Sequence, residues 1–191
     1  MYVGIHTASL PFVFAEARRR IIMHAALYSN FARSPRHIEA LSTALTKPGF
    51  RKLHAITLPF DPKRGWMEEF MHVLRPDYSL AQMEHEFNSS RDFLVRLAAR
   101  HDGLVELYET RAMPCMPVII VDDKILFGHY AHSPVPAPQG YWFSVTAPVE
   151  DMLDWLRHGR IPEDATPTQK ASLRFVADCD YAMRNAKRLF L

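Results

Sequence analysis

Apolar residues along this chain fall into two alternating kinds of segment, short uninterrupted runs and stripes at helical spacing. The run IIMHAALY, residues 21–28, is typical of a strand that is buried on both faces. Ser34 followed by Pro35 predicts the start of a helix, and a Pro-Gly pair ends it before LHAITL, residues 53–58, which predicts the next strand. This strand, helix, strand order favours a parallel pair.

The rest of the chain continues to alternate. Helical periodicity covers 66–75 and 79–100, and strand-like patterns cover 105–110, 117–130 and 140–145, the middle one being a hairpin that turns at 122–124. From Val149 the pattern is again helical, with an N-cap at Thr166 before Pro167. We therefore expect an α/β domain with a mixed sheet and flanking helices over 1–148. A helical C-terminal extension, 149–191, would pack on that domain or on a partner.

Composition narrows the class of protein. Of the 191 residues, 48% are hydrophobic and 23% are charged, which is the balance of an ordinary globular protein. The net charge of +2 is too small to indicate nucleic-acid binding by itself, although Arg18, Arg19 and Arg20 form a local basic cluster. The first residues predict neither a secretion signal nor a membrane anchor. Two cysteines, Cys115 and Cys179, make no disulfide framework, so a cytoplasmic location is expected.

The segment PCMPVIIVDDKILFGHYAHS, residues 114–133, is similar to the motif region of the phospholipase D superfamily. There a strand, helix, strand start leads to a strand with the motif H-x-K-x(4)-D, then to an apolar stretch with a turn and a glycine. Here the apolar run 118–121 precedes Asp122 and Asp123, and Gly128 ends the stretch. The likeness covers about residues 20–148 and implies a phospholipase D-like fold. It also implies a homodimer, because single-motif members of that superfamily pair their copies.

The catalytic chemistry of that family does not carry over to this sequence. Aligning the motif aspartate with Asp122 places Cys115 at the nucleophilic histidine and Pro117 at the phosphate-binding lysine. Proline offers no charge to phosphate, and a neutral thiol cannot replace the acid and base role of histidine. The resemblance therefore implies a degenerate copy without catalytic residues, and the chain is predicted to be a non-enzyme rather than an enzyme.

A rebuilt catalytic site is the alternative. The predicted hairpin places Cys115 near His129 or His132, and a cysteine beside an imidazole can act as a thiolate nucleophile, with Asp122 in the same stretch. The same cysteine and histidines are also zinc-ligand types, but their spacing does not match a helical metal motif. An inert buried cysteine is the ordinary explanation, and neither a metal nor another cofactor is expected.

Binding is the other use of such a sheet, because the loops after parallel strands meet at one edge and commonly hold ligands there. The residues in those loops that we expect to line a ligand-binding crevice are Ser29, Asn30, Arg33, Asp61, Arg64, His129, Tyr130, His132 and Trp142. The alternating prolines of SPVPAPQ, residues 133–139, either cover this crevice as a stiff flap or simply join two strands.

Three functions follow from these observations. The preferred hypothesis is a non-catalytic, phospholipase D-like regulatory or sensing module that binds a small ligand or a protein partner as a homodimer. The second is a phosphodiesterase or nuclease with the rebuilt Cys/His site. The third is a nucleic-acid-associated regulatory protein that contacts phosphates through Arg18, Arg19 and Arg20 and through Arg184, Lys187 and Arg188.

Overall fold

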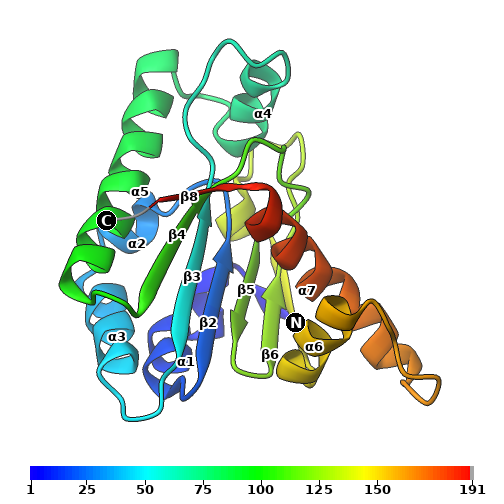
Figure 1. The fold of residues 1–191 in the computed structure, drawn as a ribbon. Helices are drawn as coiled ribbons and strands as arrows, with labels where there is room; N and C mark the ends of the chain where they lie inside the picture. The colour runs from blue at the N-terminus through cyan, green and yellow to red at the C-terminus, as the bar shows by residue number, and fades with distance from the viewer. Residues whose placement is uncertain (190–191) are drawn as a thin grey trace.

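A computed structural model describes residues 1–189 and contains one mixed sheet of eight strands (Figure 1). The strand order across the sheet is β1-β7-β6-β5-β2-β3-β4-β8. The strands are β1 (Tyr2–Val3), β2 (Arg20–His24), β3 (Lys52–Thr57), β4 (Val105–Glu109), β5 (Val118–Val121), β6 (Lys124–Phe127), β7 (Tyr141–Thr146) and β8 (Lys187–Leu189).

The central strand β2 joins a parallel half of the sheet to an antiparallel half. On one side it pairs in parallel with β3, which pairs in parallel with β4, and β8 closes that edge antiparallel to β4. On the other side β5, β6, β7 and β1 follow in antiparallel pairs. The reason lies in the connections, because helical crossovers link the parallel strands and a two-residue turn links β5 to β6.

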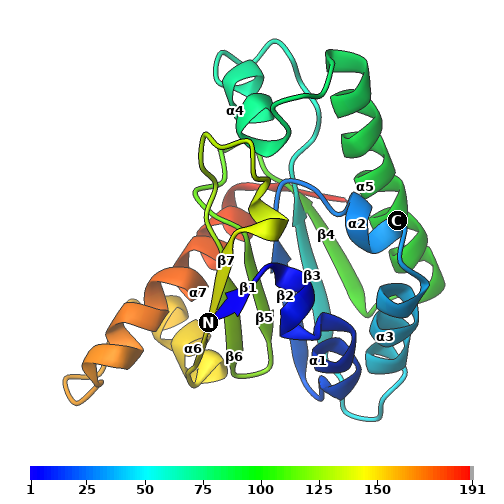
Figure 2. The same ribbon diagram turned by 180° about the vertical axis from the view of Figure 1, so that it is seen from behind.

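Helices cover both faces of the sheet. Figure 2 shows one helical layer, which consists of α1 (Leu10–Glu16), α3 (Pro35–Leu45) and α5 (Leu80–Arg100). The opposite layer, in front of the sheet in Figure 1, consists of α6 (Val149–His158) and α7 (Pro167–Asn185). The remaining short elements are η1 (Ile5–Ala8), α2 (Ser29–Ala32), α4 (Met67–Leu74) and η2 (Ala137–Gln139).

The side chains of β2 alternate between two buried clusters. Ile21 and Met23 face the layer of α1, α3 and α5, whereas Ile22 faces α7 together with Ile56 and Cys179. Both faces are therefore dry, which explains why the sequence is apolar at successive positions here. Helices α6 and α7 pack directly on the sheet. Burial raises the pKa of the Cys179 thiol well above its ordinary value, so this cysteine is an inert core residue.

The mixed α/β fold predicted from the sequence is confirmed, with local differences. Strand β2 ends at His24, and residues 25–28 leave the sheet to enter α2. At the start of α3, the Ser34 hydroxyl lies 2.8 Å from Nδ1 of His37 and makes no cap hydrogen bond. The predicted cap at Thr166 is present as a full capping box with Gln169. Over residues 1–189, no helix is both long and apolar enough to cross a membrane.

Candidate functional site

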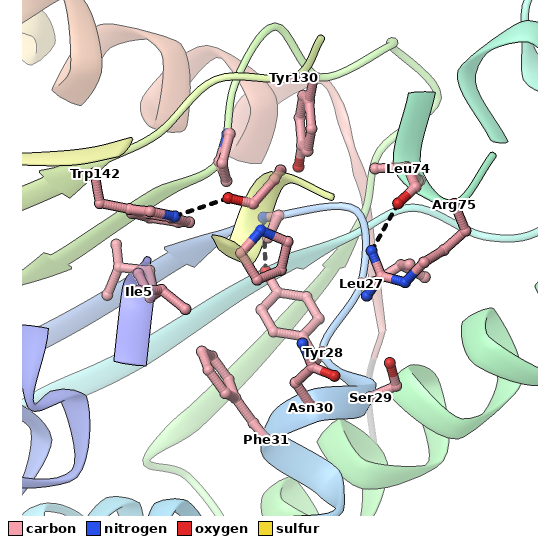
Figure 3. Close-up of a pocket in the computed structure, with 15 residues that line it drawn as sticks. Ile5, Leu27, Tyr28, Ser29, Asn30, Phe31, Leu74, Arg75, Tyr130 and Trp142 are labelled. Atoms are coloured by element: carbon pink, nitrogen blue, oxygen red, sulfur yellow. Dashed lines mark hydrogen bonds between the residues drawn. The ribbon is translucent and has the colours of Figure 1, made fainter. Parts of the chain in front are cut away.

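A pocket of about 80 Å³ lies at the carboxyl end of β2 (Figure 3). Its wall is mostly apolar and aromatic, with few polar groups. The lining residues are Ile5, Ala25, Leu27, Tyr28, Ser29, Asn30, Phe31, Leu74, Arg75, Pro117, Ile119, Tyr130, Ala137, Pro138 and Trp142. They come from segments far apart in the sequence, which meet here because β2 ends beside the start of β5.

The Trp142 wall of the pocket is fixed from two sides. Gly128 lies against the indole, and a methyl group at that glycine would come within 3.0 Å of Cε2 of Trp142. The indole Nε1–H donates a hydrogen bond to the carbonyl oxygen of Ala137 at 3.0 Å. Because Ala137 belongs to the proline-rich segment, this bond holds η2 over the pocket, where Pro138 also lines it. The segment therefore covers the pocket as well as joining two strands.

The two tyrosines of the pocket use their hydroxyl groups to hold the backbone. The Tyr28 hydroxyl accepts a hydrogen bond from the Ala25 N–H at 2.9 Å and donates to the carbonyl oxygen of Ile56 at 2.7 Å. The Tyr130 hydroxyl accepts a hydrogen bond from the Ala26 N–H at 3.1 Å. Burial raises the pKa of both phenols above the ordinary value, so both are neutral. They supply shape and aromatic surface rather than acid or base chemistry.

Ser29 and Arg33 are engaged by one buried carboxylate. The Ser29 hydroxyl donates a hydrogen bond to Glu86 of α5, and the Arg33 guanidinium forms an ion pair with the same carboxylate. Glu86 is only 4% exposed, so a positive partner is what makes its burial tolerable. Ser29 lines the pocket, whereas Arg33 lines a separate hollow beside α5. The predicted role of Arg33 as a pocket residue is therefore wrong.

Arg75 lies at the mouth of the pocket and was not predicted as a site residue. It follows α4, and Figure 3 shows its side chain reaching toward the loop after β2. An outer hollow of about 270 Å³ adjoins the pocket, and both are lined by Asn30, Arg75 and Pro138. In the sequence, an arginine at the end of a helix is an ordinary partner for the helix dipole. No local pattern distinguishes a pocket residue at this position.

Four of the nine predicted crevice residues line the pocket, namely Ser29, Asn30, Tyr130 and Trp142. Among the others, Arg64 pairs with Asp61 at 3.2 Å, so these two residues satisfy each other outside the pocket. His129 is exposed, and His132 is exposed with its Nε2 3.6 Å from the Glu69 carboxylate. The loop after β3 and the histidines after β6 therefore do not join the residues after β2.

Asp122 has a structural role at the opposite end of the sheet. Its carboxylate accepts hydrogen bonds from the backbone N–H groups of Arg18, Arg19 and Arg20 at 2.9, 2.8 and 3.0 Å. The turn at Asp122 lies beside the first residue of β2, whereas the pocket lies beyond its last residue. Strand β6 separates Asp122 from His129 by roughly 15 Å. Asp122 therefore cannot belong to one catalytic site with that histidine.

The hairpin register also differs from the predicted one. Val118 pairs with Phe127, and the Gly128 N–H donates to the carbonyl oxygen of Pro117 at 3.1 Å, so the pairing is shifted by one residue. The cause is the left-handed conformation of Asp122, which allows a two-residue turn. Cys115 is exposed in the loop before β5. Within residues 1–189, no three His, Cys, Asp or Glu side chains are grouped so as to hold a metal ion.

The predicted basic clusters are paired with carboxylates. Arg19 lies 2.6 Å from Asp123, and Arg20 lies 2.8 Å from Glu150. Near the C-terminus, Arg184 pairs with Asp180 and Arg188 pairs with Glu106. Phosphate groups would have to compete with these carboxylates, so the clusters are not open basic surfaces.

The mixed α/β fold has distant counterparts among solved structures. Comparison with family models gives no match, and neither does comparison with curated protein sequences. TrmBL2, an archaeal chromatin protein with a novel mode of DNA binding, has a TM-score of 0.48 and 12% identity, covering 98% of this chain and 52% of that protein. This chain thus spans about half the length of TrmBL2.

NucT from Helicobacter pylori is a second structural neighbour, with a TM-score of 0.42 and 14% identity over 95% of this chain and 89% of NucT. Both likenesses are too distant to carry an argument about the activity of this chain.

Proposed function

We propose that this chain is a non-catalytic binding module that holds a small ligand in the pocket at the carboxyl end of β2. One observation carries the proposal: the pocket has an aromatic wall, and its hydroxyl groups are already bonded within the protein. Apolar pockets with a few fixed polar groups at a sheet edge are typical ligand sites. A ligand without strong polar demands over most of its surface suits such a wall.

The state of the polar groups supports binding rather than turnover. A serine nucleophile needs a base that is free to take its proton, but Glu86, the partner of Ser29, is also paired with Arg33. The two buried phenols have raised pKa values and are poor bases at neutral pH. The fold would then serve as a scaffold whose occupancy is sensed by a partner or by another domain.

A neutral ring-sized probe tests this proposal directly. We expect benzamide to bind the purified protein, measured by ligand-observed NMR and by a rise in Tm. Ala25→Leu should abolish binding because it fills part of the pocket, whereas Ala32→Leu, a half-buried alanine outside the pocket, should leave binding unchanged. Equal binding by both variants would place the probe elsewhere, and absence of binding to the native protein would contradict the proposal.

The phosphodiesterase alternative has its own test. If the protein does not depend on Cys115 for chemistry, any hydrolysis of bis(p-nitrophenyl) phosphate should be identical in the native protein and in Cys115→Ala. A loss of turnover in this variant, with the fold intact by circular dichroism, would return the exposed cysteine to an active site and overturn the non-catalytic proposal.

The homodimer and the cytoplasmic location remain predictions. Native mass determination tests the first, since a monomer at every accessible concentration would contradict it. The nucleic-acid alternative predicts retention on heparin and affinity that falls steeply with salt. Because Arg19, Arg20 and Arg188 are paired with carboxylates, we expect weak retention.

A further inference from the structure

Arg75 stands where two hollows of different character meet. The inner one is the apolar pocket of about 80 Å³, and the outer one, of about 270 Å³, is lined by the polar side chains of Asp77, Tyr78 and Gln139 beside three prolines. Arg75 and Asn30 line both. A molecule that fills the inner pocket and extends outward must therefore pass the guanidinium.

The charge of Arg75 is incompletely compensated by the protein. Its Nη1 donates a hydrogen bond to the carbonyl oxygen of Leu74 at 2.7 Å, and the Tyr78 phenol beside it favours the charged form. Within residues 1–189, no carboxylate lies within ion-pair distance of this guanidinium. The side chain is half-buried, and this burial lowers its pKa from the ordinary value, although arginine still stays protonated at neutral pH.

Desolvating a cation without a counterion costs free energy, and an anion placed next to it would recover part of that cost. A guanidinium has five N–H donors in a planar fork, of which one faces Leu74. The geometry of the remaining donors matches the two oxygens of a carboxylate. Asn30, exposed on the same wall, adds a side-chain amide that can also donate.

We infer that the ligand of this pocket is a small organic carboxylate, whose apolar body occupies the inner pocket and whose carboxylate binds Arg75 at the junction with the outer hollow. This inference rests on the proposed binding function and specifies the class of ligand. The size of the inner pocket suits a body no larger than a single ring. Asp77 in the outer hollow disfavours a second negative charge, so a monoanion fits better than a phosphate dianion.

Benzoate and benzamide form a matched pair of probes, because they share a ring and differ in charge. We expect benzoate to bind the native protein about tenfold more tightly than benzamide, as one charge-assisted pair would provide. Arg75→Gln should reduce the affinity for benzoate to about that for benzamide and leave benzamide unchanged. Arg96→Gln, at an exposed arginine of α5 outside the pocket, removes the same charge and should alter neither affinity.

The outcomes separate the inference from the proposed function. Benzamide binding as tightly as benzoate would overturn the carboxylate inference while leaving the pocket as a binding site. Failure of both probes to bind the native protein would overturn both. A preference for benzoate that persists in Arg75→Gln would overturn the role of Arg75. If that variant does not fold, Arg75→Lys provides the test, because it keeps the charge but loses the fork, and it should lose part of the preference.

Discussion

Asp122 shows how one carboxylate can organise a chain junction. It receives hydrogen bonds from three consecutive N–H groups, at residues 18–20, immediately before β2. Hydrogen bonds to a charged group are stronger than neutral ones, and removing the acceptor leaves three donors without their partner. We expect Asp122→Ala to lower the free energy of unfolding by roughly 2–4 kcal/mol, measured by urea denaturation. Asp151→Ala, at an exposed position of α6, is the control and should change it little.

His54 is held between opposite charges on the open part of the sheet. Its Nε2 lies 3.0 Å from the Arg20 guanidinium, and its Nδ1 lies 3.6 Å from the Glu106 carboxylate. Burial and the positive charge of Arg20 lower the pKa of His54 from 6.5 to about 4. Burial alone would raise the pKa of Glu106, but hydrogen bonds from Tyr108 and Lys52 bring it down to about 2. Glu106 therefore stays ionised while His54 titrates.

These values predict the direction of a pH effect. Between pH 6.5 and about 4 the unfolded chain takes up a proton at His54 that the folded chain resists, so stability falls as the pH falls. The expected loss is on the order of 1–3 kcal/mol, measured by urea denaturation at pH 7 and pH 4.5. His54→Gln should show a shallower dependence. A remainder is expected, because burial also lowers the pKa of His37; an unchanged slope would contradict the assignment.

At the scale of elements, α7 is the helix whose start is most clearly defined. Thr166 accepts a hydrogen bond from the Gln169 N–H at 3.2 Å, and the Gln169 side chain accepts one from the Thr166 N–H at 2.7 Å. We expect Thr166→Ala to lower Tm through a loss of about 1 kcal/mol, since both bonds of the capping box depend on this residue. Thr168→Ala, two residues later on an exposed surface, should have a smaller effect. Equal shifts would mean that the cap contributes nothing specific.

The elements that the sequence predicts well are those whose signal is local. Helix α5 carries its apolar stripe within 80–100, and β5 with β6 carries both strands and the turn within 118–127, so each appears at the expected place. The pocket differs, because Ser29 and Trp142 meet only through strand order and Arg75 only through the placement of α4. Asp122 matched a catalytic motif in spacing, but the one-dimensional pattern does not contain the end of the sheet at which it lies.

At the scale of the whole molecule, α6 and α7 form one of the two layers that bury the sheet. Ile22, Ile56 and Ile120 of three central strands are fully buried in the cluster that includes Val176 of α7. We expect residues 1–148 alone to aggregate or remain unfolded, because this apolar face would be open to water. Soluble yield, size-exclusion chromatography and circular dichroism test this expectation. A folded monomer of 1–148 would show that the helices are dispensable for stability.

The position of β2 between the two halves of the sheet also has a consequence for the order of folding. The clamp from Arg18 to Asp122 joins groups 104 positions apart in the sequence, and the antiparallel neighbour of β2 ends beside that clamp. Contacts of such sequence separation form slowly, because a long loop must close first. During synthesis β2 can pair with β3 while its other edge stays open, until the hairpin of β5 and β6 has left the ribosome. That interval is when this chain is most exposed to strand pairing with a neighbouring molecule.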